Sequence, residues 1–117
     1  MARAGGGAAV NDRPVVELVF FAGCPHVASA RKNLEQTLTE AAHPGGWREW
    51  DLADPRAPRR VRIYSSPTVL VGGNGVAGPE SRVEEGVLSC RASGAPTVRQ
   101  IVASLREAAS RSAENPR

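Results

Sequence analysis

The chain has little of several residue types and patterns that mark particular classes of protein. Its 117 residues include two cysteines, two histidines and one methionine. Cys24 and Cys90 alone do not make the dense disulfide framework of a small secreted domain. With no Cys-x-x-Cys pair, a structural zinc site is not indicated either. In a reducing compartment, two such cysteines are expected to be reactive, metal-binding or simply packed.

Long hydrophobic runs and aromatic residues are also scarce. No apolar stretch approaches the ~20 residues that a membrane helix needs, and residues 1–11 hold only Gly-Ala-Ala-Val where a signal peptide has a long apolar core. We therefore expect a cytoplasmic protein with no membrane partner. The net charge of +3 comes almost wholly from scattered arginines, and aromatic residues make up 4% of the chain. With so few rings to stack on bases, nucleic acid is not predicted as a partner.

What is present is the composition of one modest globular domain, with 41% hydrophobic residues. Apolar periodicity, caps and turn residues predict the order strand, helix, strand, helix, strand, strand, helix. In that order the elements cover residues 15–21, 25–42, 47–52, 54–63, 68–71, 76–77 and 97–109. We expect residues 1–13 to form a disordered tail, 14–110 the domain, and 111–117 a frayed end.

This order predicts a three-layer α/β fold. A strand–helix–strand start implies a parallel pair joined by a right-handed crossover. A hairpin with a glycine-rich turn, over residues 65–77, then adds antiparallel strands. The result is a four-stranded mixed sheet flanked by about three helices, with residues 78–95 as a loop around Cys90.

The most distinctive stretch, residues 15–27, carries Cys24 from a buried strand to the start of a helix. Pro25 suits the first helical position, where its missing N–H had no partner to lose. A thiol there faces free backbone N–H groups and the positive end of the helix dipole, which favour the thiolate. We interpret Cys24 as an exposed, reactive thiol that His26 tunes, or beside which His26 contacts substrate. The simpler alternatives are a small buried hydrophobic residue and a surface histidine.

Two motifs carry a family resemblance: Phe21-Ala22-Gly23-Cys24-Pro25-His26-Val27 and Ser66-Pro67-Thr68. With the order of elements, they resemble the thioredoxin superfamily in its compact, glutaredoxin-like form, over roughly residues 14–110. The resemblance implies a cis peptide bond before Pro67, with Ser66 beside the Cys24 sulfur. It also implies that Ser66, Pro67 and Thr68 form the substrate-binding position, where Ser66 offers backbone groups to an extended substrate.

The chain departs from the family's dithiol pattern at Val27, which stands where a second cysteine would be. Cys24 therefore resembles a monothiol centre that forms mixed disulfides in thiol–disulfide exchange, as in an oxidoreductase. The expected partners are protein or small-molecule thiols and disulfides. Glutathione or another low-molecular-weight thiol would be a co-substrate, and no bound cofactor is predicted. Cys90 is a candidate resolving thiol if its loop brings the two Cα atoms within ~7 Å.

Two other functions fit the same residues. A non-catalytic module could hold a soft ion such as mercury or copper through Cys24 and Cys90, with His26 as a third ligand, or could bind a partner protein. Alternatively, the domain is a redox-inert scaffold for protein interaction. The sequence leaves these alternatives open.

Overall fold

The computed structural model describes residues 14–43, 46–78, 82–90 and 94–114, the last four of these by their backbone alone. The predicted tail, residues 1–13, lies outside them, as do residues 115–117 of the predicted frayed end. Among the described residues, no helix combines the length and apolar character needed to cross a bilayer.

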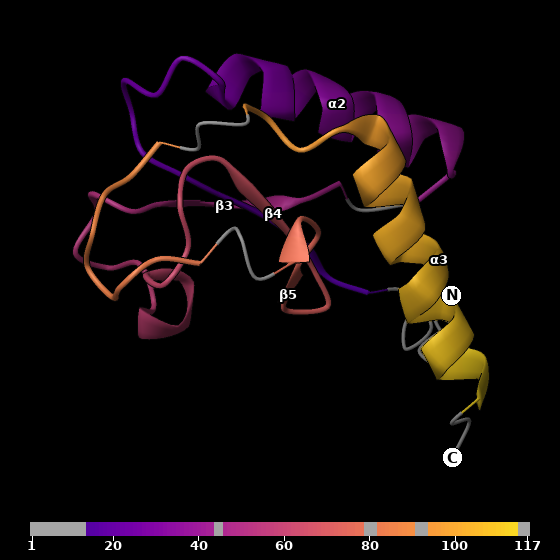
Figure 1. Ribbon diagram of the computed structural model, residues 1–117. Helices are drawn as coiled ribbons and strands as arrows, with labels where there is room; N and C mark the ends of the chain where they lie inside the picture. Colours follow the sequence, from indigo (N-terminus) through magenta and orange to yellow (C-terminus); the bar gives the residue numbers. More distant parts are fainter. Residues whose placement is uncertain (1–13, 44–45, 79–81, 91–93, 115–117) are drawn as a thin grey trace, which may run out of the picture.

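The centre of the fold is a four-stranded mixed sheet with strand order β3-β2-β4-β5 (Figure 1). Its strands are β2 (Val16–Phe20), β3 (Arg48–Asp51), β4 (Thr68–Val71) and β5 (Asn74–Gly75). β2 pairs parallel with β3 and antiparallel with β4, and β4 pairs antiparallel with β5. This confirms the mixed sheet that the sequence predicts.

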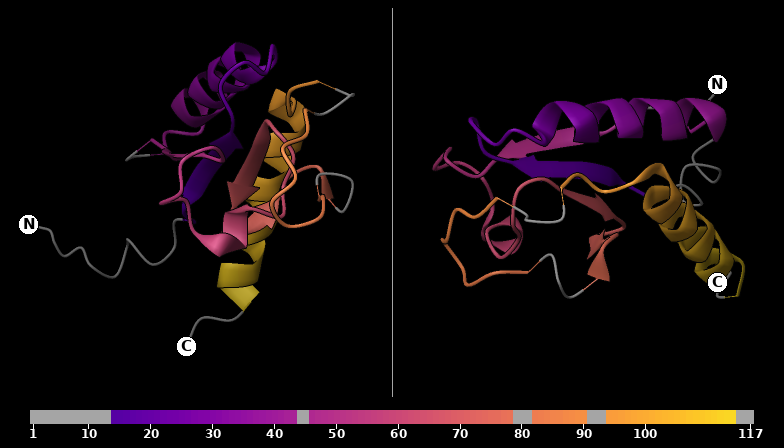
Figure 2. Two further views of the ribbon diagram at one scale, coloured as in Figure 1. Left: turned by 90° about the vertical axis from the view of Figure 1, so that its left-hand side faces the viewer. Right: turned by 45° about the horizontal axis from the view of Figure 1, so that its top comes forward.

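Two α-helices cover one face of the sheet, α2 (Val27–Glu40) and α3 (Val98–Glu114). The start of α3 lies beside α2, and α3 then runs away from α2 at a steep angle, as Figures 1 and 2 show. Their apolar stripes meet the side chains that β2 and β4 direct to this face, because alternate residues of a strand point to opposite sides. We call the resulting cluster the helical-face core. Its buried members are Val16, Leu18, Ala30, Leu34, Leu38, Val69, Val71 and Ile101.

The start of α3 shows how its sequence determines its position. Gln100 N donates to Thr97 Oγ1 at 3.1 Å, and Thr97 N donates to Gln100 Oε1 at 3.0 Å. These reciprocal bonds are the predicted capping box, which satisfies backbone donors that a helix end leaves open. The helix continues to Glu114, four residues past the domain end expected at 110.

The opposite face of the sheet is covered by chain without an α-helix. Residues 52–64 cross it and contain only a short 3-10 turn, η1 (Arg59–Val61). We call the apolar cluster beneath them the coil-face core. Its buried members are Val19, Leu52, Ala57, Val61, Tyr64 and Leu70.

The predicted helix over residues 54–63 was therefore wrong, and the described part of the chain has two α-helices rather than three. Pro58 is extended, with ψ at 152°, and it has no N–H to contribute to a helix. The backbone carbonyls of this segment find another donor instead. The Arg62 guanidinium donates to Asp54 O at 3.0 Å and to Ala57 O at 3.1 Å. The Arg62 side chain thus donates to backbone carbonyls that, in an α-helix, would accept from backbone N–H groups.

Candidate functional site at the Cys24–Cys90 disulfide

Cys24 lies in a turn that connects β2 to α2. The chain reverses at Gly23, whose φ of +95° is a conformation that a residue with a side chain rarely adopts. Cys24 N donates to Phe21 O at 3.4 Å, and Val27 N donates to Cys24 O at 3.4 Å. The first helical residue is Val27, with His26 as the N-cap. The prediction that Pro25 opens the helix was wrong, because a separate turn closes between Cys24 and Val27 first.

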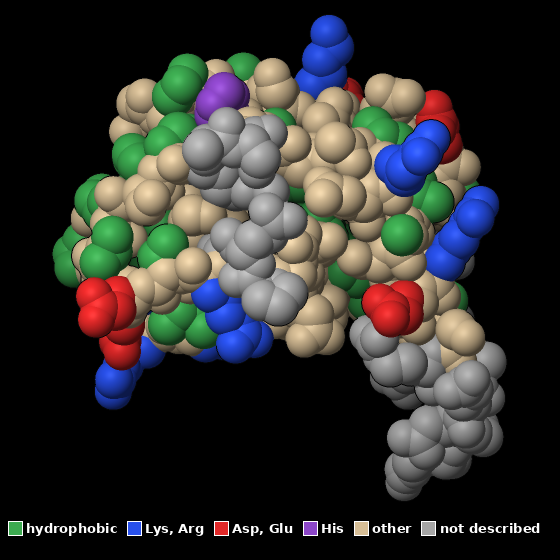
Figure 3. Space-filling model, in the orientation of Figure 1, with side chains coloured by type: hydrophobic (Ala, Val, Ile, Leu, Met, Phe, Trp, Pro, Cys, Tyr) green, Lys and Arg blue, Asp and Glu red, His purple; other side chains and the backbone are tan. Residues whose placement is uncertain are grey.

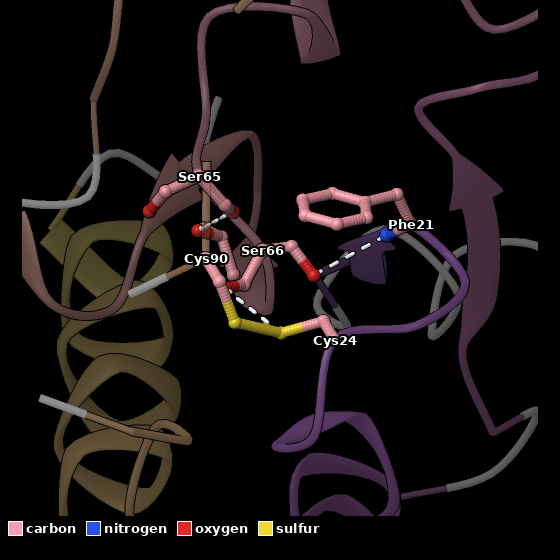
Figure 4. The surroundings of a disulfide bond; sticks show 6 residues. Phe21, Cys24, Ser65, Ser66 and Cys90 are labelled. Carbon is pink, nitrogen blue, oxygen red and sulfur yellow. Dashed lines mark hydrogen bonds between the residues drawn. A yellow bond between two sulfur atoms is a disulfide. The ribbon is translucent and has the colours of Figure 1, made fainter. Parts of the chain in front are cut away.

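The Cys24 side chain is buried, with 7% of its surface exposed. The expected exposed thiol was therefore also wrong. Cys90 lies directly against it, and the two cysteines form a disulfide with Cα atoms 6.0 Å apart (Figure 4). That separation falls within the range that disulfides require. The loop around Cys90 thus reaches Cys24, and neither cysteine is free.

Ser66 is the third component of the site and is fully buried. Its hydroxyl oxygen accepts a hydrogen bond from Phe21 N at 3.2 Å, and its carbonyl oxygen lies 3.5 Å from Cys24 Sγ. The Ser66–Pro67 peptide bond is cis, as the family resemblance implied. Thr68 begins β4, and its hydroxyl donates to Ser65 O at 2.6 Å. The structure therefore brings both predicted motifs together.

Residues 82–90, which we call the strap, bring Cys90 to this position. The strap follows the segment that leads into β4, as the orange chain at the left of Figure 1 shows. One of its backbone bonds with that segment runs from Ser66 N to Ser89 O, at 2.7 Å. Ser66 and Cys90 form an isolated parallel bridge next to it. The strap thus occupies the backbone donor of Ser66 as well as the sulfur of Cys24.

His26 lies at the start of α2, as its N-cap residue. Its ring faces Gly94, where an added Cβ would lie 3.9 Å from the ring atoms Cε1 and Nδ1. Within the described ranges, no group of three His, Cys, Asp or Glu residues is arranged to hold a metal ion. The three-ligand set of Cys24, His26 and Cys90 is therefore not assembled there.

The structure adds a buried charge cluster that the sequence interpretation missed. Glu17 lies on β2 with its side chain directed to the coil face, and it is 3% exposed. Arg60 donates to both carboxylate oxygens, at 2.5 and 3.1 Å, and Trp50 Nε1 donates at 2.8 Å. The signal in the sequence was a single acidic residue inside an apolar run, because a buried charge requires a partner.

The contacts of Glu17 determine its protonation. Burial by itself would raise the pKa of Glu17. The hydrogen bonds from Arg60 and Trp50, with the charges of Arg60 and Arg48, outweigh burial and lower this pKa below its ordinary value. Since its carboxylate is committed to these two donors, Glu17 stabilises the coil face as an anion. We assign it a structural role.

The surface near the disulfide is apolar. Val87 and Leu88, both on the strap, are 43% and 52% exposed. On the face seen in Figure 3, hydrophobic side chains gather along the left-hand side, where Figure 1 places the strap and the turn after β2. Exposed apolar residues of this kind would suit contact with another polypeptide.

Fold and site together define a small α/β domain whose one disulfide joins the turn after an inner strand to a strap along the segment before β4. The comparisons with family models, with curated proteins and with solved structures each found no match to this chain. Its function is therefore argued from the site alone.

Proposed function

We propose that this chain is a thiol–disulfide exchange protein of thioredoxin-like fold, in which Cys24 is the attacking thiol and Cys90 the resolving thiol. The observation that carries the proposal is the Cys24–Cys90 pair itself, with Cα atoms 6.0 Å apart and Cys24 Sγ 3.5 Å from the Ser66 carbonyl. Val27 excludes a second thiol within the motif, and Cys90 supplies it from 66 residues away.

The position of Cys24 just before a helix supports its assignment as the attacking thiol. Cys24 lies three residues before α2, so the positive end of the helix dipole is close to its sulfur. A positive potential at a sulfur favours the thiolate, which is the attacking species and the better leaving group in thiol–disulfide exchange. Cys90 lies on the strap, outside any helix, and lacks this stabilisation.

With these roles, the protein dithiol reduces a substrate disulfide in two steps. The Cys24 thiolate attacks one sulfur of a substrate disulfide, a Cys24–substrate bond forms, and the other substrate sulfur leaves as a thiolate that takes a proton from water. The Cys90 thiolate then attacks Cys24 Sγ and expels the first substrate sulfur. Two electrons have passed from the protein dithiol to the substrate, and the Cys24–Cys90 disulfide of the structure remains.

A low-molecular-weight thiol such as glutathione resets the protein. Cys90 is the more exposed of the two bonded residues, so its sulfur is the accessible target. Attack on Cys90 Sγ releases Cys24 as the stabilised thiolate. A second thiol then attacks the mixed disulfide on Cys90, which regenerates the dithiol and yields the oxidised form of the small thiol.

Trapping the first intermediate tests the proposal. Incubation of reduced Cys90→Ser with oxidised glutathione should give a stable adduct on Cys24, because the resolving thiol is absent. Reduced wild-type protein should instead give the internal disulfide and no lasting adduct. The products are identified by mass spectrometry of the intact protein and of its peptides.

Cys24→Ser is the matched control, and its Cys90 should form the adduct more slowly at neutral pH. Equal rates for the two variants would contradict the assignment of Cys24 as the attacking thiol. Absence of any adduct, with one-to-one binding of Hg(II) or Cu(I) by the reduced wild type, would favour the soft-metal module. If neither an adduct nor metal binding is observed, the redox-inert scaffold for protein interaction is favoured.

A further inference from the structure

The strap takes up the Cys24 sulfur, which the proposed function assigns to substrate. It also takes up the backbone N–H of Ser66, where the family resemblance implies an extended substrate. We propose that the strap is an internal competitor for this site, held in place by the disulfide and released when the disulfide is reduced. This inference rests on the proposed function for the identity of the site and adds its regulation.

The geometry of the strap is that of a bound extended chain. Ser66 N donates to Ser89 O at 2.7 Å, and the next residue, Cys90, forms a parallel bridge with Ser66 and a disulfide with Cys24. A substrate polypeptide in a mixed disulfide with Cys24 would need the same combination of one backbone bond and one sulfur bond. The two cannot occupy Ser66 N and Cys24 Sγ at once.

The non-covalent hold on the strap is weak. Residues 84–88 are all exposed, and among the described residues neither core cluster includes a member of the strap. Besides the Ser66 bond, Val83 N donates to Ile63 O at 2.7 Å and Gly86 N to Arg62 O at 3.1 Å. Segments with few buried apolar contacts and exposed backbone bonds open at low free-energy cost.

One ion pair adds to this hold but lies in solvent. Arg59 and Glu85 pair at 2.8 Å with side chains 85% and 44% exposed. Water and salt screen such pairs, so this one holds the strap only weakly. The disulfide is therefore the principal restraint. In the oxidised protein, the strap blocks binding of a second polypeptide at Cys24 and Ser66 N. In the reduced protein, both groups are accessible.

Amide hydrogen exchange followed by NMR tests the inference. Oxidised wild-type protein is compared with Cys24→Ser/Cys90→Ser, which lacks the disulfide and cannot react. In the double variant, the Ser66, Val83 and Gly86 amides should exchange faster by about tenfold or more, as expected for local opening. Their protection should fall below that of the β4 amides, which open only with the sheet.

Glu85→Gln in the oxidised protein is the matched control. It removes the ion pair and keeps the disulfide, so protection of the Ser66 amide should stay as in the wild type. If Ser66 in the double variant remains as protected as the β4 amides, the strap stays in place without the disulfide and the inference is overturned. Because no thiol is present in that variant, this result is independent of the glutathione trapping that tests the proposed function.

Discussion

The two faces of the sheet are stabilised in different ways. The helical face is covered by α2 and α3, and its core is built from aliphatic side chains at helical and strand spacing. The coil face is covered by residues 52–64, which contain one turn of 3-10 helix. Arg60 in this segment pairs with the buried carboxylate of Glu17 on β2. The strap bonds to the end of this covering at Arg62 and Ile63, and to Ser66 just beyond it.

The helical face is structural, whereas the coil face carries the strap that we propose opens on reduction. Helices satisfy their own backbone groups and bury an apolar stripe, so the helical face does not depend on a covalent link. The coil face depends on hydrogen bonds from arginine side chains, and the strap beside it depends on the disulfide. A segment that must open in a reaction belongs with the less stable part of a protein.

Removing the disulfide should lower the free energy of unfolding more than any other change considered. It closes a loop between residues 66 positions apart, and chain entropy assigns such a link about 4 kcal/mol of stability. The free energy of unfolding of Cys24→Ser/Cys90→Ser, measured in urea, should fall by about that amount relative to the oxidised protein. An unchanged free energy of unfolding would mean that the link does not restrain the unfolded chain.

The next effect tests the helical face. Leu34 on α2 is fully buried, and Leu34→Ala removes three carbons and leaves a cavity between helix and sheet. The free energy of unfolding should fall by about 3 kcal/mol. Lys32→Ala, on the exposed side of the same helix, is the control and should change it by less than about 0.5 kcal/mol. A small effect of Leu34→Ala would show that this core is loosely packed.

The smallest of the three effects tests the buried charge on the coil face. Arg60→Met leaves the Glu17 carboxylate with Trp50 as its hydrogen-bond donor. The free energy of unfolding at neutral pH should fall by roughly 2 kcal/mol, below the usual cost of breaking a buried pair, because one donor remains. Combined with Leu34→Ala, the losses should add to within about 0.5 kcal/mol. Strong coupling would contradict the separation of the two faces.

The contribution of Glu17 to the free energy of unfolding depends on pH. Its pKa is lowered in the folded protein, so the folded state binds fewer protons than the unfolded state. The stabilisation is therefore present above the unfolded pKa, about 4.3, and is lost as the pH falls through the lower folded pKa. In Arg60→Met this loss should shrink, because the pKa of Glu17 rises. Urea unfolding at a series of acidic pH values would show the difference between the two proteins.

The sequence predicted the helical face well because its signals are local. Ala30, Leu34 and Leu38 recur at helical spacing, and Thr97 with Gln100 marks a helix start within four residues. The coil face was predicted poorly because its contacts are not local. Arg62 replaces the predicted helix by bonding to carbonyls five and eight residues away, which no periodicity reveals.

Part of the candidate site was likewise predictable from the sequence, and part was not. The family resemblance placed Cys24 and Ser66 together, and the structure confirms that proximity at 3.5 Å. The burial of Cys24 and its bond to Cys90 depend on how residues 82–90 pass along the segment before β4. A loop without periodicity gives no sequence signal for such a path. The position of Cys90 therefore needed the three-dimensional structure.

In the proposed function, Cys24 and Cys90 form one reversible redox pair in the folded protein. The most direct test is to equilibrate the protein in a series of glutathione buffers of different redox potential. The thiols are then quenched with acid, alkylated and counted by mass spectrometry, while circular dichroism monitors folding. We predict that both thiols appear and disappear together while the domain stays folded. Formation of glutathione adducts on separate cysteines, without the Cys24–Cys90 disulfide at any redox potential, would contradict the proposed function.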